Sequence, residues 1–278
     1  MCGFRDKCRL SAICLDHADP AAFYTSPWLQ KPALFLTYRL LFTVAVLSIL
    51  VFYILDWYGR FPDVPWGITI SDWGFIALTV HGVWSAAVCL HQSYRAKRVG
   101  RLDLVESTRT LHWSLKAGWV ISDCSFVGAF NISILFGALL GSTAEWNASD
   151  ILIHVVNSIL VIIDILVSGF PCRLLHAVYP MGICLVYLIF NVVYWAMGGT
   201  FVDGKTYIYP FLDYSNDPGM AAGAAVGFIL SAVVGQLMVY GLVKLREAVV
   251  RCVRERSGQV TGDDPRSFRV DQSALDNL

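Results

Sequence analysis

The sequence predicts an all-α membrane protein, a bundle of six transmembrane helices with both termini in the cytosol. Composition is the first observation: 56% of the residues are hydrophobic and 15% are charged, and the mean hydropathy is +0.58, outside the usual range of soluble domains. The second is a set of six apolar stretches long enough to cross a bilayer, which needs roughly 20 residues. These stretches cover residues 33–55, 73–91, 117–140, 149–168, 176–197 and 219–243.

The distribution of Lys and Arg gives the orientation, because positive residues are retained on the cytosolic side of a membrane. The segments between the stretches that would lie outside hold only Arg60 and Lys205, and most of the other Lys and Arg residues fall in the alternate segments and the tails. This pattern predicts cytosolic tails at 1–32 and 244–278 around a membrane domain at 33–243. The polar tail after residue 257 is expected to be largely disordered.

The chain carries no phosphate-binding glycine loop, nucleophile elbow or His-Glu metal motif in the required context. We therefore expect no cofactor, no metal site and no nucleic-acid partner, with the lipid bilayer as the main partner. The thiols of Cys2, Cys8 and Cys14 favour reversible acylation over zinc binding, because their spacing does not match a zinc-ligand pattern. Asn147 begins an Asn-Ala-Ser sequon in an external segment and is the predicted glycosylation site.

Three ionisable residues are expected at one depth inside the membrane: Arg39, Asp123 and Asp164. Each lies roughly 6 to 9 Å below the inner surface at a rise of 1.5 Å per residue. Because an unpaired charge is costly in hydrocarbon, we predict one charge cluster in which the guanidinium lies between two carboxylates. Two interpretations stay open: an ion cluster that fixes helix packing, and the lining of a cavity for a polar lipid head group, with Gln236 as a further member.

A second polar layer is expected nearer the outer face. Its members lie within about nine residues of the outer ends of their stretches, and they are His81, Asn131, His154, Asn157 and Asn191. Imidazole and amide groups at this depth must hydrogen-bond to each other, to water or to a ligand, since lipid offers no partner. A packing network and a ligand site both fit this pattern.

The last apolar stretch has one smooth face. Small residues recur there every four positions, at Gly219, Gly223, Gly227, Ser231 and Gly235. Such a face lets another backbone approach closely. It serves either packing within the bundle or a homodimer, or contact with a second membrane protein.

Five phrases together carry a resemblance to a known family. They are SPW at 26–28, FLTYR at 35–39, HVVNS at 154–158, RLLHAVYP at 173–180 and YIYPFLD at 207–213. Over about residues 26–241 the chain resembles the rolling stone family. The resemblance implies a multi-pass plasma-membrane protein with a role in myoblast or other cell–cell fusion, without evident catalysis, and the Asn147 sequon adds the expectation of a glycoprotein.

That family is distantly similar to the androgen-induced-protein family of intramembrane hydrolases, which implies an alternative function. Those enzymes cleave fatty acid esters of hydroxy fatty acids with a Thr nucleophile and a His base, roles that the motifs place at Thr37 and, in part, at His154. The second His of their His-x-x-His motif is Asn157 here, and an amide cannot accept the proton. The predicted stretches also place Thr37 and His154 roughly 15 Å apart in depth. A hydrolase therefore needs a rearranged base, for which His176 is available.

Overall fold

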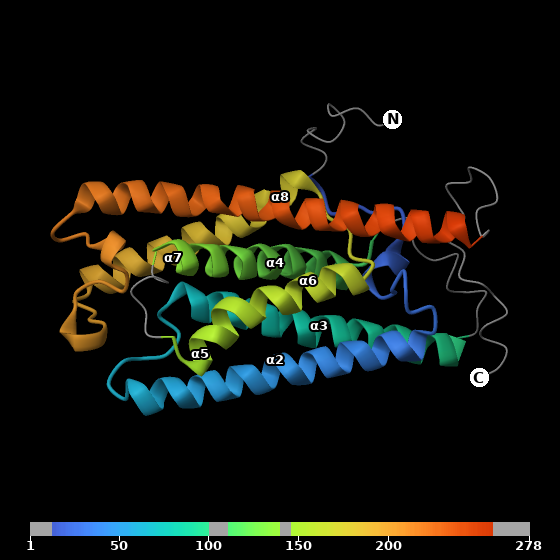
Figure 1. The fold of residues 1–278 in the computed structure, drawn as a ribbon, viewed down its shortest axis with the longest axis horizontal. Coiled ribbons are helices and arrows are strands. Elements are labelled where there is room, and N and C mark those ends of the chain that lie inside the picture. Colours follow the sequence, from blue (N-terminus) through green and yellow to red (C-terminus); the bar gives the residue numbers. More distant parts are fainter. Residues whose placement is uncertain (1–12, 100–110, 140–145, 258–278) are drawn as a thin grey trace.

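Long helices run side by side along the longest axis of the protein (Figure 1). The computed structural model describes residues 13–99, 111–139 and 146–257. Within these ranges, six helices are long and apolar enough to cross a membrane. They are α2 (Pro32–Arg60), α3 (Ile70–Val99), α4 (Trp113–Leu139), the continuous run α5 (Ala148–Ile151), η3 (Leu152–Val156) and α6 (Asn157–Val167), the run η4 (Leu174–Ala177) and α7 (Val178–Ala196), and α8 (Pro218–Arg256). The predicted fold class is confirmed, whereas the cytosolic side of each terminus stays a prediction.

The helices are antiparallel in sequence order, so alternate helix ends meet at the same end of the bundle (Figure 1). We call the end with the starts of α2 and α4 the inner end, after the cytosolic side predicted for it, and the opposite end the outer end. Short 3-10 turns lie outside the long helices: η2 (Pro20–Phe23), η5 (Val202–Gly204) and η6 (Pro210–Leu212). Cys2, Cys8 and the tail after residue 257 lie outside the described residues.

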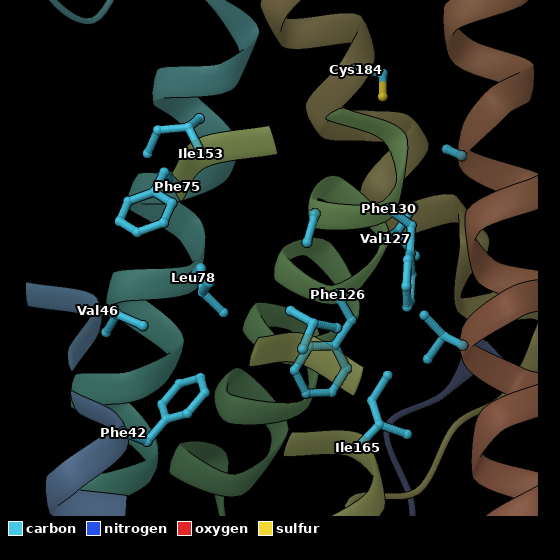
Figure 2. Close-up of a cluster of buried hydrophobic side chains, with 14 of the residues drawn as sticks. Phe42, Val46, Phe75, Leu78, Phe126, Val127, Phe130, Ile153, Ile165 and Cys184 are labelled. Carbon is cyan, nitrogen blue, oxygen red and sulfur yellow. The ribbon is translucent and has the colours of Figure 1, made fainter. Parts of the chain in front are cut away.

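Helix α4 is central, because it contacts α3, α6, α7 and α8, while α3 also packs against α2. The core along α4 is apolar: Phe126, Val127 and Phe130 are buried there and meet side chains of the neighbouring helices (Figure 2). The outward faces stay apolar as well, with Leu41 of α2 and Leu230 of α8 more than half exposed. A bundle that is apolar both inside and outside is expected for a protein whose solvent is lipid.

The segment before α2 closes the inner end of the bundle. Phe23 of η2 packs edge-on against Trp119 of α4 and Phe170, with ring centroids 5.2 and 5.6 Å apart. The hydroxyl of Ser26 donates to the carbonyl of Val167 at the end of α6. Gly169 allows this close approach, since a Cβ there would meet the carbonyl oxygen of Ala22 at 2.7 Å. Part of the predicted N-terminal tail is therefore docked on the membrane domain.

Helix α8 continues well past the predicted end at residue 243. Arg246, which is buried, explains the extra turns: its guanidinium donates to the carbonyls of Ile165, Ser168 and Phe170. These carbonyls follow or end α6, where backbone acceptors lack helical partners and the helix dipole is negative. The arginine thus stabilises the C-terminal end of one helix from the last helix of the chain.

Candidate functional site

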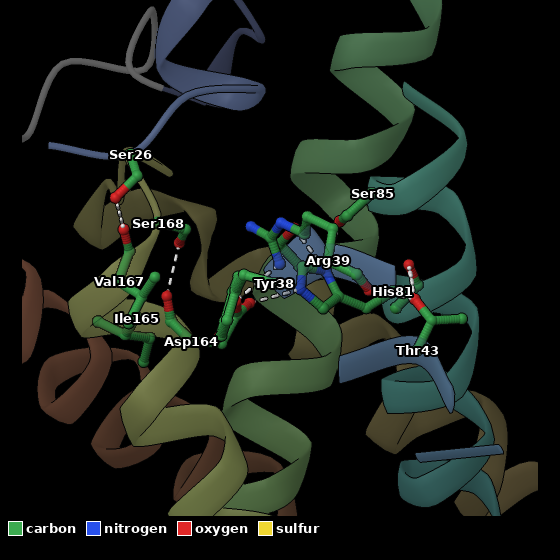
Figure 3. A network of polar contacts seen from close by, with 12 residues as sticks. Ser26, Tyr38, Arg39, Thr43, His81, Ser85, Asp164, Ile165, Val167 and Ser168 are labelled. Atoms are coloured by element: carbon green, nitrogen blue, oxygen red, sulfur yellow. Dashed lines mark hydrogen bonds and ion pairs between the residues drawn. The ribbon is translucent and has the colours of Figure 1, made fainter. Parts of the chain in front are cut away.

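The first intramembrane polar cluster joins α2, α3 and α6 (Figure 3), and it reaches α4 through the hydroxyl of Ser122, which lies 3.0 Å from His81 Nδ1. Arg39 Nη1 lies 2.7 Å from Asp164 Oδ1, and His81 Nε2 lies 2.8 Å from Asp164 Oδ2. The hydroxyl of Tyr38 donates to the same carboxylate at 2.9 Å. Arg39, His81 and Asp164 are fully or almost fully buried. A buried carboxylate needs such partners, because removal of one member of a buried ion pair costs roughly 3–5 kcal/mol.

Aromatic rings complete the surroundings of Arg39. Its Nε and Nη2 atoms have no hydrogen-bond partner among the described residues. The guanidinium carbon instead lies 4.9 Å from the ring centroid of Phe35 and 5.5 Å from that of Phe170. Rings at this distance stabilise a cation through their π faces, and the effect grows when water is excluded.

The second polar cluster joins α4, η4 and α8. Asp123 Oδ2 lies 2.7 Å from His176 Nδ1, and Gln236 Nε2 donates to the carbonyl of Arg173 at 2.8 Å and faces Asp123 Oδ1 at 3.5 Å. The expectation of one cluster around Arg39 is therefore corrected: among the described residues, Asp123 pairs with His176 and not with Arg39. Depth in the membrane does not determine the direction in which a side chain points around the helix axis. Asp123 points toward α7 and α8, away from Arg39.

A large cavity lies in the outer half of the bundle and is separate from both clusters. It has a volume of about 550 Å³ and is lined by α2, α3, α4, α5, η3, α7, α8 and the segment 201–212. Most of its lining side chains are aliphatic or aromatic, with a few hydroxyl, amide and imidazole groups and three charged ones, Arg60, Asp150 and Lys205. Neither Arg39, Asp123 nor Asp164 lines it. The interpretation of the charged residues as a cavity lining is therefore corrected as well.

The residues predicted for the outer polar layer separate into four environments. Asn131 and His154 line the cavity. His81 belongs to the inner cluster instead, because α3 begins earlier than predicted and the side chain reaches Asp164 across the bundle. Asn157 is buried, and its amide atoms have no hydrogen-bond partner in the part of the chain that the structure describes. Asn191 accepts a hydrogen bond from the hydroxyl of Tyr214 at 2.9 Å. The layer is thus not one network.

His154 lies on the π-helical turn η3, which interrupts its helix beside the cavity. Its imidazole stacks on Phe136 of α4, with ring centroids 3.7 Å apart and an interplanar angle of 6°. No described residue forms a hydrogen bond with its Nδ1 atom, which is buried. Single π-helical turns occur frequently at functional sites. This makes the cavity wall at His154 the best candidate for a ligand contact.

A third polar group, at the outer end, was not predicted. Asp72 accepts hydrogen bonds from the hydroxyl of Tyr53 at 2.6 Å and from the backbone N–H of Thr69 at 2.8 Å, and the Thr69 hydroxyl accepts from the Asp72 N–H in return. This is a capping box that starts α3, and its Thr-x-x-Asp spacing is readable in the sequence. Tyr209 nearby accepts from the N–H of Ile70, and burial raises the pKa of its hydroxyl.

Comparison with known proteins decides the family. A family model described as protein rolling stone matches residues 4–256. The chain belongs to the rolling stone family. The protein rolling stone of Drosophila melanogaster is 30% identical over 230 residues, which cover 81% of this chain and 82% of that relative. No solved structure matches the chain. The resemblance inferred from the five sequence phrases is confirmed.

The two residues matched to the hydrolase motifs do not meet in this rolling stone family member. Thr37 lies near the inner end of α2 on an exposed face, between Leu34 and Leu41, which are 53% and 65% exposed. His154 lines the outer cavity, and Thr37 does not. The backbone conformation offers no break in α2 that would bring the hydroxyl inside. Thr37 and His154 therefore do not form a nucleophile and base in this structure.

The glycine face of α8 divides between two surroundings. At Gly235 a Cβ would meet Val127 Cγ1 at 2.8 Å and Asn131 Oδ1 at 2.9 Å of α4. At Gly223 and Gly227 a Cβ would meet nothing within 4 Å, and both residues are exposed, as is Gly219. Packing inside the bundle thus explains Gly235 alone. A homodimer contact at the other three glycines stays a prediction.

Asn147, the predicted glycosylation site, begins the helix α5 as its N-cap. Its side-chain oxygen accepts the backbone N–H of Asp150 at 3.0 Å, and the Asp150 carboxylate accepts the N–H of Asn147 in return. The cap uses the amide oxygen, whereas a glycan attaches to the amide nitrogen. Structural and modification roles are therefore compatible at this residue, and glycosylation stays a prediction.

Proposed function

We propose that this chain is a plasma-membrane protein that takes part in cell–cell fusion, as in myoblasts, and that it acts without catalysis. Membership of the rolling stone family supports the proposed part in cell–cell fusion. Both termini would lie in the cytosol and Asn147 would carry a glycan, as the distribution of positive residues favours.

The single observation that carries the noncatalytic part is the position of Thr37. A nucleophilic hydroxyl needs a base within about 2.6–3.2 Å, and Thr37 lies on an exposed face among leucines. The described segments at the outer end, 61–69 and 197–217, are also short. They favour action through the membrane bundle and its lateral partners over recognition by a large outer domain.

A cell-mixing assay tests this proposal. The chain is deleted from two fusion-competent cell populations that carry complementary halves of a split luciferase, and each variant is then re-expressed in both. We expect the wild type, Thr37→Ser and Thr37→Ala to restore the same signal, with surface biotinylation reporting equal amounts at the plasma membrane. Unchanged fusion after deletion would refute the fusion role. Loss with Thr37→Ala but not with Thr37→Ser would instead support a Thr-dependent ester hydrolase.

A further inference from the structure

The outer cavity has the size, shape and lining of a lipid site. We propose that it binds one neutral, hydroxyl-bearing lipid that enters from the bilayer. Its volume of about 550 Å³ falls within the roughly 300–1,000 Å³ of small-molecule sites, which are mostly apolar with a few placed polar groups. Along α4 the lining extends from Cys124 to Phe136, about 18 Å at a rise of 1.5 Å per residue. An elongated apolar slot of this length suits a hydrocarbon body better than a polar solute.

The entry route follows from the helix arrangement. Helix α3 packs against α2 and α4, and α7 packs against α4 and α8, so the cavity lies where α3 and α7 face each other. Their outer halves meet through rings, with Trp73 5.4 Å from Tyr187. Ile76 of α3 and Ile183 of α7 line the cavity and are also exposed on the bundle. A lipid in the surrounding bilayer can therefore reach the cavity sideways through an apolar opening.

The charges at the outer end of the cavity argue against a charged head group. Arg60 and Lys205 line this end, but Arg60 forms an ion pair with Asp56 at 2.7 Å, and the carboxylate of Asp150 also lines the cavity. The two bases and two acids cancel. A head group with net charge would lose its hydration without gaining an uncompensated opposite charge. A hydroxyl group has no such cost where it finds a hydrogen-bond partner.

Partners for a hydroxyl are present in the lining. His154 lines the cavity, and its ring is held in place by stacking on Phe136. Ser71 and Tyr207 bring further hydroxyl groups to the wall. Buried polar groups are usually paired with protein, water or ligand. A ligand hydroxyl in the cavity has these imidazole and hydroxyl groups of the wall as hydrogen-bonding partners.

The test uses the full-length protein purified in lipid nanodiscs and photoactivatable diazirine lipids. A monoacylglycerol and a sterol are the two neutral probes, a fatty acid is the charged one, and labelled peptides are mapped by mass spectrometry. We expect a neutral probe to label peptides of the cavity wall on α3, α4 and α7, competed by the same lipid without the diazirine. The stronger of the two neutral probes identifies the lipid class. Stronger labelling of the wall by the fatty acid would overturn the neutral head group.

Variants make the site assignment specific. Ala224 on α8 lines the cavity, whereas Ala222, two residues away, is exposed and does not. Ala224→Phe should reduce wall labelling by about tenfold or more, and Ala222→Phe should leave it unchanged. His154→Leu should reduce it by about two- to tenfold, as expected for one net hydrogen bond. Ala77→Phe, which fills the cavity from α3, is the second filling variant if Ala224→Phe does not fold.

One result separates a specific site from lipid that merely surrounds the protein. Labelling spread over the outward faces of α2 and α8, without competition and without response to either filling variant, would refute the cavity site. The measurement does not depend on fusion. A chain that binds the lipid but is dispensable for fusion would overturn the proposed function alone, and a fusion-active chain with an unlabelled cavity would overturn this inference alone.

Discussion

The inner half of the bundle fills its interior with paired polar groups, whereas the outer half leaves a cavity of about 550 Å³ and an imidazole whose Nδ1 atom has no hydrogen-bonding partner among the described residues. At the inner level, Asp164 contacts Arg39 and His81, and Asp123 contacts His176. Docking of residues 13–31 and the capping of α6 by Arg246 close that end further. The polar contacts of the inner half thus fix the positions of the helices, and the outer half contains the cavity in which we propose that a ligand binds.

The two inner clusters together reach all the long helices. One joins α2, α3 and α6 and reaches α4 through Ser122, and the other joins α4, η4 next to α7, and α8. Each long helix, or the turn that leads into it, therefore has a side chain or carbonyl in a polar contact at the inner end. In hydrocarbon, apolar contacts alone specify helix position weakly, since lipid tails are as apolar as leucine. Hydrogen-bonded pairs in the interior provide the missing specificity, and the outer halves can then diverge around the cavity.

The largest expected effect is from breaking the first cluster. Arg39→Met should lower the free energy of unfolding by about 3–5 kcal/mol, because Asp164 would stay buried with its cation removed. Thermal unfolding in detergent and surface expression measure the loss. Thr37→Ala, two residues away on the exposed face, is the matched control and should change neither.

A double variant sharpens this prediction. Arg39→Met with Asp164→Leu removes both charges and should recover part of the stability lost by Arg39→Met alone. An equal or greater loss in the double variant would mean that the ion pair itself stabilises the fold. No loss with Arg39→Met would show that the inner half does not depend on this cluster.

The second cluster should break independently of the first. Asp123→Leu leaves His176 without its acceptor, while Gln236 keeps the carbonyl of Arg173, and should cost about 1–3 kcal/mol. Among the described residues the two clusters have no hydrogen-bonding partner in common and are linked only along α4, where Ser122 adjoins Asp123. The losses of Asp123→Leu and Arg39→Met should therefore add within about 0.5 kcal/mol when combined. A large deviation from additivity in the same unfolding measurement would restore the single cluster that the sequence predicted.

The fold was predictable because its signals are long-range averages. Six apolar stretches correspond to the six long helices. Helix α8 extends beyond the span predicted at 219–243 into residues that are polar by composition, and only the structure shows Arg246 turning inward to the carbonyls of Ile165 and Phe170. The position of a residue along a predicted span gives its depth in the membrane, but it does not identify the residue with which a buried charge pairs.

The candidate site was predictable only in part, for the same reason. Depth correctly brought Arg39 and Asp164 together, but the direction in which each helix turns separated Asp123 from them and moved His81 inward. The cavity could not be predicted, since its wall is assembled from several helices and the segment 201–212 and not from any motif. The π-helical turn at His154 likewise leaves no readable periodicity in five residues.

Two glycines of α8 allow a packed position and an open position on one helix to be compared. Gly235→Ala should lower the free energy of unfolding by about 1–3 kcal/mol, because its Cβ would overlap Val127 and Asn131 of α4. Gly227→Ala meets open space and should leave stability unchanged or raise it by up to about 1 kcal/mol through helix propensity. Thermal unfolding in detergent checks both. Equal losses would mean that Gly227 also packs inside the protein and is not available to a second chain.

The smallest expected effect separates the two roles of Asn147 at the outer end. Asn147→Asp keeps the oxygen that caps α5 but removes the nitrogen to which a glycan attaches, so the glycosidase-sensitive mass should disappear while stability changes by less than about 0.5 kcal/mol. Asn147→Ala removes the cap as well and should cost about 1 kcal/mol. Gel shift after glycosidase treatment of the cell-expressed protein and unfolding of the deglycosylated protein measure the two roles. A wild-type chain without a glycan would remove this support for the outer assignment of the loop before α5, and equal stability of the two variants would show that the cap contributes nothing to the outer half.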